Sequence, residues 1–279
     1  MDTAPITILT GGTSGIGQAL TAGLVAAGHQ VVLIARDEGR AARVLSGLAR
    51  PPGMAAPLVV RADLRSPAQT RAAAARVLDL VPRVDGLVHC AGIWPARLER
   101  TAEGLEASFA VNALAPLILN RLLRQRLAAS AARVVQVTAG LYPMARVDLT
   151  RTPVGDDFHP LRTYANTKLC NILTTVEAAA AADAGAATFT LVHPGVVRTK
   201  LGDRPGPLGW LLRGAKLFWS SPETGARAPL HLATTDTGGA AHECRYFDRA
   251  TERALVGPAT DRALGQALWG RMRELGQVD

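Results

Sequence analysis

Short apolar runs alternate with longer amphipathic stretches along most of the chain. The runs at 6–10, 30–36, 57–64, 84–92, 133–140 and 188–199, the last including an exit loop, are rich in Val, Ile and Leu and predict buried strands. The stretches at 37–50, 67–80, 101–128 and 160–184 repeat apolar positions at three- and four-residue steps and predict helices. This rhythm predicts a parallel sheet with helices on both faces.

The composition suits one large α/β domain. Of 279 residues, 48% are hydrophobic and 19% charged, so the chain can bury a sizeable core, and no linker rich in Gly, Ser and Pro divides it. The stretch 263–275 is amphipathic and predicts a packing helix. Neither a signal peptide nor a membrane span is indicated, so we expect a cytoplasmic protein.

Charge and cysteine content limit the kinds of ligand that the chain could bind. The net charge is +8, but the basic residues are nearly all Arg and are spread over many segments, which argues against nucleic acid and leaves a phosphorylated small molecule compatible. Cys90, Cys170 and Cys244 lack metal-ligand spacing. We expect reduced thiols and no metal site.

A glycine-rich turn, TGGTSGIG at 10–17, joins the first strand to a helical pattern. Gly11, Gly15 and Gly17 allow a sharp turn and a close approach to a pyrophosphate, which the N–H groups at the helix start would favour. A glycine turn without a ligand is the alternative. The flanking strand and helix favour dinucleotide binding.

The end of the second predicted strand bears on cofactor choice. Arg36 stands there, followed by Asp37. An Arg at this position can pair with a 2′-phosphate, which favours NADP(H) over NAD(H), although a solvent-facing Arg is the alternative. Asp63 and Leu64 end the third strand and could contact adenine.

The helix at 160–184 carries Tyr164 and Lys168 one turn apart inside an apolar pattern. An ammonium near a phenol lowers the phenol pKa from about 10, so Tyr164 could exchange a proton near neutral pH. The alternative is a surface pair, since this spacing recurs by chance.

Several motifs together resemble the short-chain dehydrogenase/reductase family. They are TGGTSGIG at 10–17, CAG at 90–92, Asn112, YANTK at 164–168 and PGVVRT at 194–199, in the family's order and spacing. YANTKLCNIL, HPGVVRTKL, the insertion before Tyr164 and SPETGARAPLHLAT resemble the retinol dehydrogenase-like branch. That branch reduces or oxidises lipophilic carbonyls and alcohols with NADP(H).

The resemblance implies a Rossmann-type, doubly wound parallel sheet of about seven strands in a single domain over 1–279. The cofactor half would span about 1–130 and the catalytic and substrate half about 131–279. Tyr164 would be the general acid/base, Lys168 would hold the nicotinamide ribose and tune Tyr164, Asn112 would support the proton relay, and Thr199 would contact the carboxamide. Hydride would pass between nicotinamide C4 and the substrate carbon. Motifs and resemblance together predict a cofactor site of Gly11, Thr13, Ser14, Gly15, Ile16, Gly17, Arg36, Asp63, Leu64, Ala91, Gly92, Lys168, Pro194, Gly195, Val197 and Thr199.

The chain departs from the family at its catalytic serine. Ala139 falls at that position, and Thr138, one residue earlier, should point to the opposite face of the strand. A missing donor of this kind costs about 2.7–4 kcal/mol, or 10²–10³ in rate, unless Tyr142, the Gly140 amide, a water or a substrate hydroxyl replaces it. Cys90 replaces the family's Asn, and His89 beside it is interpreted as a strand-end histidine rather than a catalyst.

The segment at 200–221 falls where the family has a variable substrate lid. It is strongly apolar and contains hinge glycines, so it predicts a lipophilic substrate, with a dimer contact or a membrane-surface helix as alternatives. The predicted substrate pocket comprises Trp94, Ala139, Tyr142, Trp210, Leu211 and Phe218.

Three functions remain open. The first is an NADP(H)-dependent oxidoreductase acting on a bulky lipophilic ketone or secondary alcohol. The second is a non-redox cyclase, dehydratase or epimerase of secondary metabolism that uses Tyr164 as acid/base, as Ala139 suggests. The third, a ligand sensor without turnover, is weakened because Tyr164, Lys168 and Asn112 all remain. The resemblance also implies a homodimer or tetramer through helices at 112–128 and 161–184.

Overall fold

A single eight-stranded sheet organises the molecule. The computed structural model describes residues 4–182, 186–198, 219–240 and 242–279. Its strands lie in the order β3-β2-β1-β4-β5-β6-β7-β8. They are β1 (Ile6–Thr10), β2 (Gln30–Ala35), β3 (Leu58–Arg61), β4 (Gly86–His89), β5 (Arg133–Val137), β6 (Thr188–His193), β7 (Cys244–Asp248) and β8 (Thr251–Arg253). Strands β1 to β7 pair in parallel and β8 adds an antiparallel edge, so the expected doubly wound sheet is confirmed.

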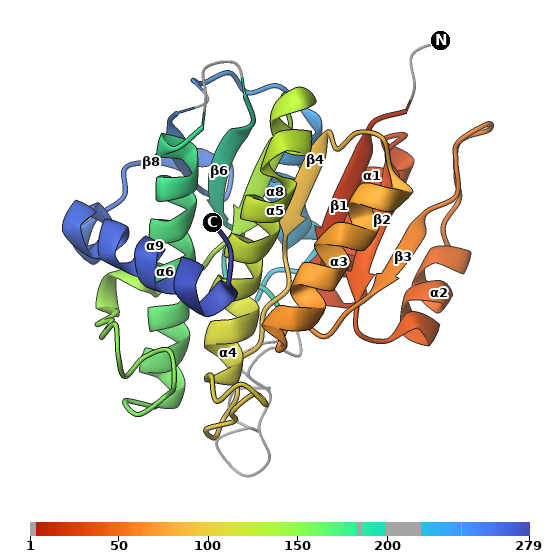
Figure 1. The fold of residues 1–279 in the computed structure, drawn as a ribbon. Coiled ribbons are helices and arrows are strands. Elements are labelled where there is room, and N and C mark those ends of the chain that lie inside the picture. The colour runs from red at the N-terminus through yellow and green to blue at the C-terminus, as the bar shows by residue number, and fades with distance from the viewer. Residues whose placement is uncertain (1–3, 183–185, 199–218, 241) are drawn as a thin grey trace.

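Helices cover both faces of this sheet (Figure 1). One layer holds α3 (Pro67–Leu80), α5 (Ala115–Ala129) and α6 (Pro160–Ala180), and the other holds α1 (Gly15–Ala26) and α8 (Pro222–Thr234). Helix α2 (Glu38–Ser46) lies beside β3, and α9 (Arg262–Gly276) crosses α6 and α5. Short turns complete the described chain: α4 (Ala107–Phe109), η1 (Ala110–Leu114), η2 (Tyr142–Met144) and η4 (Gly257–Thr260).

The central strands are mainly apolar because both faces of the sheet are buried. Neighbouring residues of β1 divide between the two sides: Ile8 packs with Val77 of α3, whereas Leu9 packs with Leu24 of α1. All four side chains are fully buried. Alternate side chains of a strand point to opposite faces, so a strand covered on both faces needs a continuous apolar run.

The helix predicted from residue 101 begins later. Helix α4 starts at Ala107, and the buried Glu106 carboxylate caps it by accepting hydrogen bonds from the N–H groups of Ser108 (3.0 Å) and Phe109 (2.7 Å). The chain then passes through a π-helical turn, Ala110–Leu114, into α5. A side-chain cap fixes a helix start more strongly than hydrophobic periodicity does.

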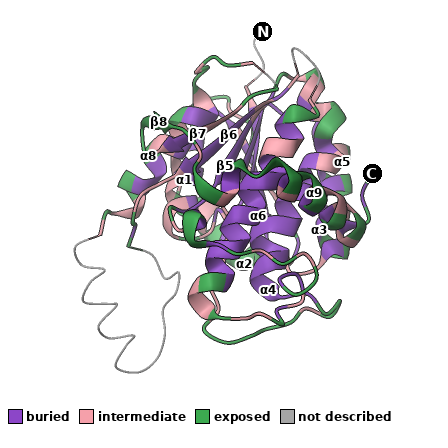
Figure 2. Ribbon diagram, turned by 90° about the vertical axis from the view of Figure 1, so that its left-hand side faces the viewer, coloured by how far each residue is buried: buried purple, intermediate pink, exposed green. Residues whose placement is uncertain are grey.

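Helix α6 has no open face along its middle. Every residue from 163 to 175 is buried within the single chain, as Figure 2 shows by its continuous purple ribbon. Helix α9 covers part of it with Leu268 and Met272, both fully buried, while Gln266 and Glu274 face outward. The predicted oligomer contact through the helix at 161–184 stays a prediction, and within the single chain α9 packs on α6 and covers part of its outer surface.

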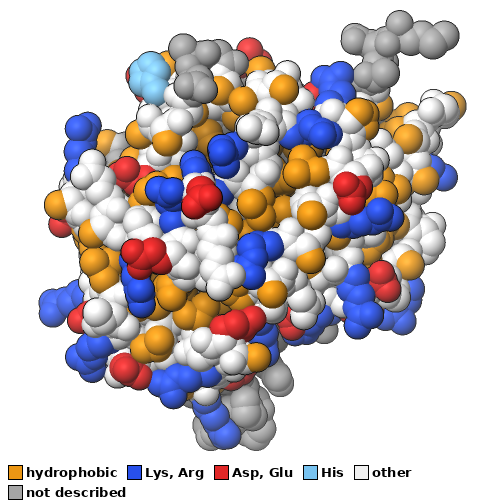
Figure 3. All heavy atoms as spheres, viewed as in Figure 1, with side chains coloured by type: hydrophobic (Ala, Val, Ile, Leu, Met, Phe, Trp, Pro, Cys, Tyr) orange, Lys and Arg blue, Asp and Glu red, His pale blue; other side chains and the backbone are white. Residues whose placement is uncertain are grey.

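The outer surface is mixed in charge. On the face viewed in Figure 3, basic and acidic side chains are interspersed with small apolar ones. None of the helices in the described ranges is both long enough and apolar enough to cross a bilayer.

Candidate active site

A cavity of about 1070 Å³ runs along the carboxyl ends of the strands. It crosses the boundary between β1 and β4, where the strand order reverses and open α/β sheets bind their ligands. Its walls come from the turn after β1, the ends of β2 to β5, and one side of α6. The site therefore forms where the topology predicts it.

The backbone of the glycine turn is packed so closely that a side chain at Gly11 or Gly17 would clash with it. Gly11 has φ +73°, and a Cβ atom there would lie 2.6 Å from the Ala91 Cα. A Cβ atom at Gly17 would lie 2.1 Å from the Gly11 carbonyl oxygen. The Thr21 hydroxyl donates to Gly12 O (2.9 Å) and also lies 3.0 Å from Gly17 O. This turn presents backbone at the start of α1, where an anion is favoured.

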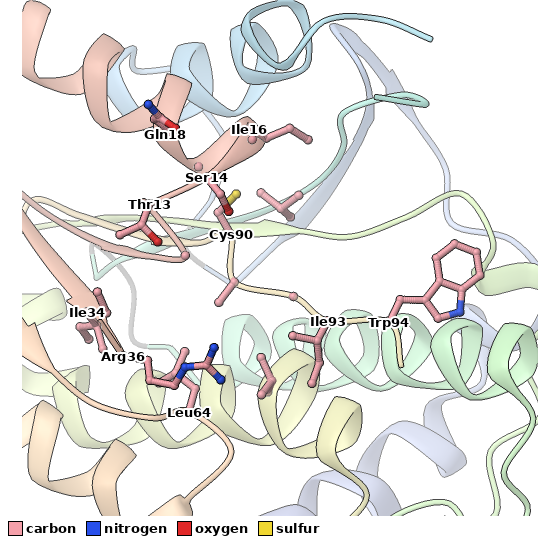
Figure 4. Close-up of a pocket in the computed structure, with 18 of the residues that line it drawn as sticks. Thr13, Ser14, Ile16, Gln18, Ile34, Arg36, Leu64, Cys90, Ile93 and Trp94 are labelled. Carbon is pink, nitrogen blue, oxygen red and sulfur yellow. The ribbon is translucent and has the colours of Figure 1, made fainter. Parts of the chain in front are cut away.

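Arg36 and Asp37 have opposite orientations at the end of β2. Arg36 lines the cavity, and its guanidinium reaches past Leu64 (Figure 4). Asp37 instead caps α2 by accepting from the Arg40 N–H at 2.9 Å. Its carboxylate is therefore engaged by the helix, and the basic side chain is the one beside the adenosine position.

Tyr164 and Lys168 lie close together on the side of the cavity that α6 forms. The Lys168 Nζ lies 5.6 Å from the Tyr164 ring centroid and donates to the Val137 carbonyl at 3.2 Å. Both side chains are buried, and both line the cavity. The tyrosine and lysine are thus brought together as predicted.

Burial, rather than the neighbouring ammonium, controls the protonation of this pair. Desolvation raises the pKa of Tyr164 above its ordinary value and lowers the pKa of Lys168 to about 8. The expectation that Lys168 lowers the Tyr164 pKa is wrong here, because removing both groups from water favours their uncharged forms. At neutral pH Tyr164 is a neutral phenol that can donate a proton.

An indole covers the ring of Tyr164. Trp94 stacks on Tyr164 with ring centroids 4.6 Å apart and an interplanar angle of 16°. The Trp94 Nε1–H donates to the Pro160 carbonyl at 2.8 Å, which fixes the indole against the start of α6. Figure 4 shows Trp94 at the opposite end of the cavity from Arg36. Trp94 was predicted to line the pocket, and it does.

The amino-acid sequence of the chain is similar to that of known enzymes. Residues 5–149 match the family described as short chain dehydrogenase. The chain belongs to this family. Retinol dehydrogenase 14 of Mus musculus is 32% identical over 280 residues, which cover 94% of this chain and 83% of that protein. A candidate daunorubicin C-13 ketoreductase, DnrU of Streptomyces sp. (strain C5), is 33% identical over 266 residues, which cover 94% of this chain and 89% of that protein.

A solved structure shares the fold. The short-chain dehydrogenase of Burkholderia cenocepacia J2315 in complex with NADP superposes with a TM-score of 0.65 at 23% identity, covering 88% of this chain and 97% of that chain. The resemblance read from the sequence motifs is confirmed. The protein is an enzyme of an oxidoreductase family with retinol dehydrogenase and ketoreductase relatives.

Most of the cofactor residues predicted for this short-chain dehydrogenase line one cavity. They are Gly11, Thr13, Ser14, Gly15, Ile16, Gly17, Arg36, Asp63, Leu64, Ala91, Gly92 and Lys168. Pro194, Gly195 and Val197 do not line it, and Val197 packs against α8 beside Gly225. Thr199, Trp210, Leu211, Phe218 and most of the predicted lid at 200–221 lie outside the described residues.

The Asn112 side chain is hydrogen-bonded to the loop that follows β4. Its side-chain amide accepts from the Ile93 N–H (2.9 Å) and donates to the Ile93 carbonyl (3.0 Å) and the Thr167 hydroxyl (3.0 Å). The Asn112 backbone carbonyl accepts from Asn171 Nδ2 at 3.2 Å. In the described structure Asn112 therefore positions the loop after β4, and no direct bond joins it to Lys168.

The residues around the missing serine are placed differently from expectation. Thr138, expected to point away, lines the cavity, but its hydroxyl donates to the Lys168 backbone carbonyl at 3.4 Å. Ala139 and Tyr142 do not line the described cavity. Tyr142 is buried against Tyr246, and its hydroxyl accepts from the Val256 N–H at 3.3 Å. Residues beyond the strand end turn into η2, so strand alternation no longer places them.

Two arginines of the cavity wall were missed in the sequence. Arg40 and Arg198 both line the cavity. Arg40 stands one helical turn after Arg36 in a predicted helix, a spacing that could have identified it. Arg198 lies within the PGVVRT motif, and its N–H donates to Ser220 O at 2.9 Å.

His89 is a structural residue, as interpreted from the sequence. Its ring is buried, its Nε2 lies 2.9 Å from Asn120 Oδ1, and burial lowers its pKa to about 4. Within the described ranges, no group of three or more His, Cys, Asp or Glu side chains is arranged to hold a metal ion.

Proposed function

We propose that this short-chain dehydrogenase is an NADP(H)-dependent oxidoreductase that interconverts a bulky lipophilic ketone and its secondary alcohol. One observation carries the proposal: a neutral buried phenol, Tyr164, shares a cavity with the cation Lys168 and, toward the end of β2, with Arg36. That is the arrangement required to bind a phosphorylated dinucleotide and protonate a carbonyl beside it.

The chain's residues fit the cofactor. Ser14 stands at the N-cap of α1 without a side-chain capping bond, so its hydroxyl and the first N–H groups of the helix are available to a diphosphate. Arg36 is exposed and suits a 2′-phosphate, while Asp37 is committed to capping α2. The NADP in the Burkholderia structure supports the same choice.

The chemistry assigned to the chain is proton transfer and charge stabilisation. NADPH, when bound, supplies the hydride. Tyr164 donates its proton to the carbonyl oxygen as negative charge develops there, and Lys168 stabilises that charge from beneath the ring. Trp94 excludes water from one face of the phenol.

A lipophilic substrate is supported by the walls nearest Tyr164. Trp94 lies against Tyr164, its N–H is already bonded to Pro160, and Ile93, Pro95 and Val111 add apolar surface to the same cavity. The relatives' names support the same substrate class. Retinol dehydrogenase 14 is named for the alcohol retinol, and DnrU is named for the C-13 ketone of daunorubicin. We place the enzyme in secondary metabolism on the strength of DnrU.

The second candidate is non-redox acid/base chemistry on a natural-product intermediate. It is favoured by Ala139, and by the Thr138 hydroxyl being turned to the Lys168 carbonyl. Without a hydroxyl beside Tyr164, carbonyl polarisation falls to the phenol alone.

Ala139→Ser separates the two candidates when two assays are run together, one of NADPH absorbance and one of product mass. For a ketone reductase, the new hydroxyl should maintain or raise kcat on a lipophilic ketone, by roughly tenfold. Thr138→Val is the matched control. It should leave kcat within about threefold of the unmutated enzyme's value, because the Thr138 hydroxyl already donates to the Lys168 backbone carbonyl. Tyr164→Phe should lower kcat by about 10²–10⁴ and leave NADPH affinity nearly intact.

Product formed without NADPH consumption, together with no gain from Ala139→Ser, would establish the non-redox candidate instead. A large loss of ketone reduction in Thr138→Val would show that Thr138 supplies the missing donor.

A further inference from the structure

The segment at 94–106, which we call the strap, lies between β4 and α4 and forms part of the cavity wall. Trp94 and Glu99 of the strap line the cavity. Residues 96–100 and 102–104 are exposed to solvent. A segment with few buried apolar contacts opens at a lower free energy than the core does, so the strap can move while the sheet stays folded.

Both ends of the strap are fixed. At one end, the Asn112 side chain is bonded to the N–H and the carbonyl of Ile93, at 2.9 and 3.0 Å. At the other end, the buried Glu106 carboxylate caps α4, and the Glu106 N–H donates to Pro153 O at 2.8 Å. Fixed ends and an exposed middle are the features of a hinged element that can open and close over a cavity.

Two polar contacts hold the middle of the strap to the segment at 62–66, which follows β3. Arg65 and Glu99 form an ion pair at 3.0 Å. The Ser66 hydroxyl donates to Glu103 Oε1 at 2.9 Å. Arg65 and Glu99 both line the cavity, so their ion pair joins the wall that follows β3 to the wall that follows β4.

The ion pair between these walls is weak enough to break and form again. The Arg65 and Glu99 side chains are 38% and 47% exposed, and ion pairs at this exposure contribute little free energy and are screened by salt. On its other side the strap is held by Arg100, which donates to Val154 O and to Asp156 Oδ1, both at 2.8 Å. The strap is therefore anchored toward α6 and can part from the segment at 62–66.

We propose that Arg65 and Glu99 form a latch that keeps the strap closed against the cavity and sets the rate at which a bound dinucleotide leaves. When the ion pair breaks, the strap turns away from the segment at 62–66 and the two walls separate. The Ser66–Glu103 hydrogen bond supports the latch from outside the cavity. The proposal rests on dinucleotide binding in this cavity, as proposed above, but it does not depend on the choice between NADPH and NADH.

The test is the dissociation rate of each reduced dinucleotide, measured by stopped-flow fluorescence when the loaded protein is mixed with an excess of the oxidised form. Glu99→Gln should raise the dissociation rate by about two- to fivefold, the range that a surface ion pair can supply, and by the same factor for NADPH and NADH. Between about 0.05 and 0.5 M NaCl, the difference between Glu99→Gln and the unmutated protein should shrink, because salt weakens the latch only where it exists.

A charge swap separates the ion pair from direct contacts with the dinucleotide. Glu99→Arg should raise the dissociation rate more than Glu99→Gln does, because two cations then oppose each other. Adding Arg65→Glu to that variant should restore the rate to within about twofold of the unmutated value. Glu274→Gln is the matched control, since it breaks an exposed ion pair with Arg271 on α9, away from the cavity, and should leave the rate unchanged.

Hydrogen exchange of the protein without dinucleotide gives a second measurement. The backbone amides of the strap should exchange about two- to fivefold faster in Glu99→Gln, whereas those of α6 should not change.

The remaining outcomes contradict particular parts of the proposal. Unchanged dissociation rates in Glu99→Gln and Glu99→Arg overturn the latch and leave dinucleotide binding standing. A faster rate that the charge swap does not restore shows that Glu99 or Arg65 acts on the dinucleotide directly, and it also overturns the latch. Failure of both dinucleotides to bind overturns the proposed function together with the latch, whereas equal affinity for the two overturns the NADP(H) preference alone.

Discussion

Tyr164 and Lys168 show that two opposing electrostatic effects act on one phenol. A nearby cation favours the phenolate, whereas removal from water favours the phenol. Here the phenol lies beneath Trp94 and the ammonium is bonded to Val137, so desolvation prevails for both groups. A neutral phenol is the form needed to protonate a carbonyl, and this residue therefore favours reduction at neutral pH.

The pH dependence should reflect this. Tyr164 keeps its proton through neutral pH because its pKa is raised, and Lys168, with a pKa of about 8, loses its charge above that pH. We expect kcat/KM for ketone reduction to be level from pH 6 to about 7 and to fall as the pH rises through about 8, since at saturating NADPH it reports the pKa values of the enzyme that has bound cofactor but not yet ketone. Initial rates at saturating NADPH test this, and a rate that rises across the same interval would contradict the assignment.

The indole on Tyr164 should also have a measurable effect. Trp94→Ala removes a stacked pair worth about 0.5–1.5 kcal/mol and admits water to the phenol, so kcat should fall by about two- to tenfold. In the oxidative direction, the pH at which activity rises should move down toward the ordinary phenol value of about 10. Trp269→Ala is the control, because Trp269 lies on α9 beside Arg121, away from the cavity. The same pH profile in both variants would rule out this role for Trp94.

At the scale of elements, sequence patterns predicted best where local structure and burial agree. Helix α3 was predicted at 67–80 and is found at Pro67–Leu80, where Pro67 and the Ser66 cap mark its start. The strands were predicted too long at their carboxyl ends, as with 84–92 against Gly86–His89, because the loops that form the site are also apolar. Apolar content alone cannot separate a strand from the cavity wall that follows it.

The site was predictable where a motif fixes the backbone. The glycine turn and the Tyr164/Lys168 pair were located because few other residues satisfy those geometries. The hydrogen bonds of Tyr142 and Asn112 were not predicted, since they depend on which distant partner, Val256 or Ile93, the fold brings to them. The spacing from Arg36 could have identified Arg40, but its bond to the Thr13 carbonyl could not be predicted, because a backbone partner leaves no mark in the sequence.

The glycine turn should tolerate no side chain at its crossing point. In Gly17→Ala the new methyl would lie 2.1 Å from the Gly11 carbonyl oxygen, so the turn must open. We expect a loss of stability of about 1–3 kcal/mol and at least tenfold weaker NADPH binding. Gly270→Ala in α9, where a Cβ meets nothing within 4 Å, should instead stabilise by about 0.5–1 kcal/mol. Denaturant titration measures the stability of the two variants, and calorimetry measures their affinity for NADPH. Unchanged NADPH binding in Gly17→Ala would contradict the proposed role of the glycine turn in holding the diphosphate.

At the scale of the whole molecule, α9 packs on the outside of the layer that contains α5 and α6. The family match ends at residue 149, whereas α9 packs Leu268 and Met272 onto α6 and α5. The carboxyl end is secured by Arg71, which donates to Gly276 O at 2.9 Å, and by Arg121, which donates to the Asp279 carbonyl. The last helix is thus part of the core.

Removal of α9 should change the state of association. A chain ending at Asp261 exposes the apolar surface of α5 and α6, and we expect it to self-associate or aggregate, whereas the full chain should not associate through this face. Sedimentation velocity compares the two, with Gln266→Arg on the outer face of α9 as a control that should leave the full chain unchanged. A full-length oligomer that Gln266→Arg dissociates would contradict this arrangement.

The position of α9 also bears on how the protein is made. A ribosome adds about 5–20 residues per second, so the surface of α5 is synthesised several seconds before the helix that covers it. Leu268 and Met272 can dock only after they have left the exit tunnel. During that interval the nascent chain exposes the apolar surface of its helices. We therefore expect a stalled or truncated translation product to bind chaperones.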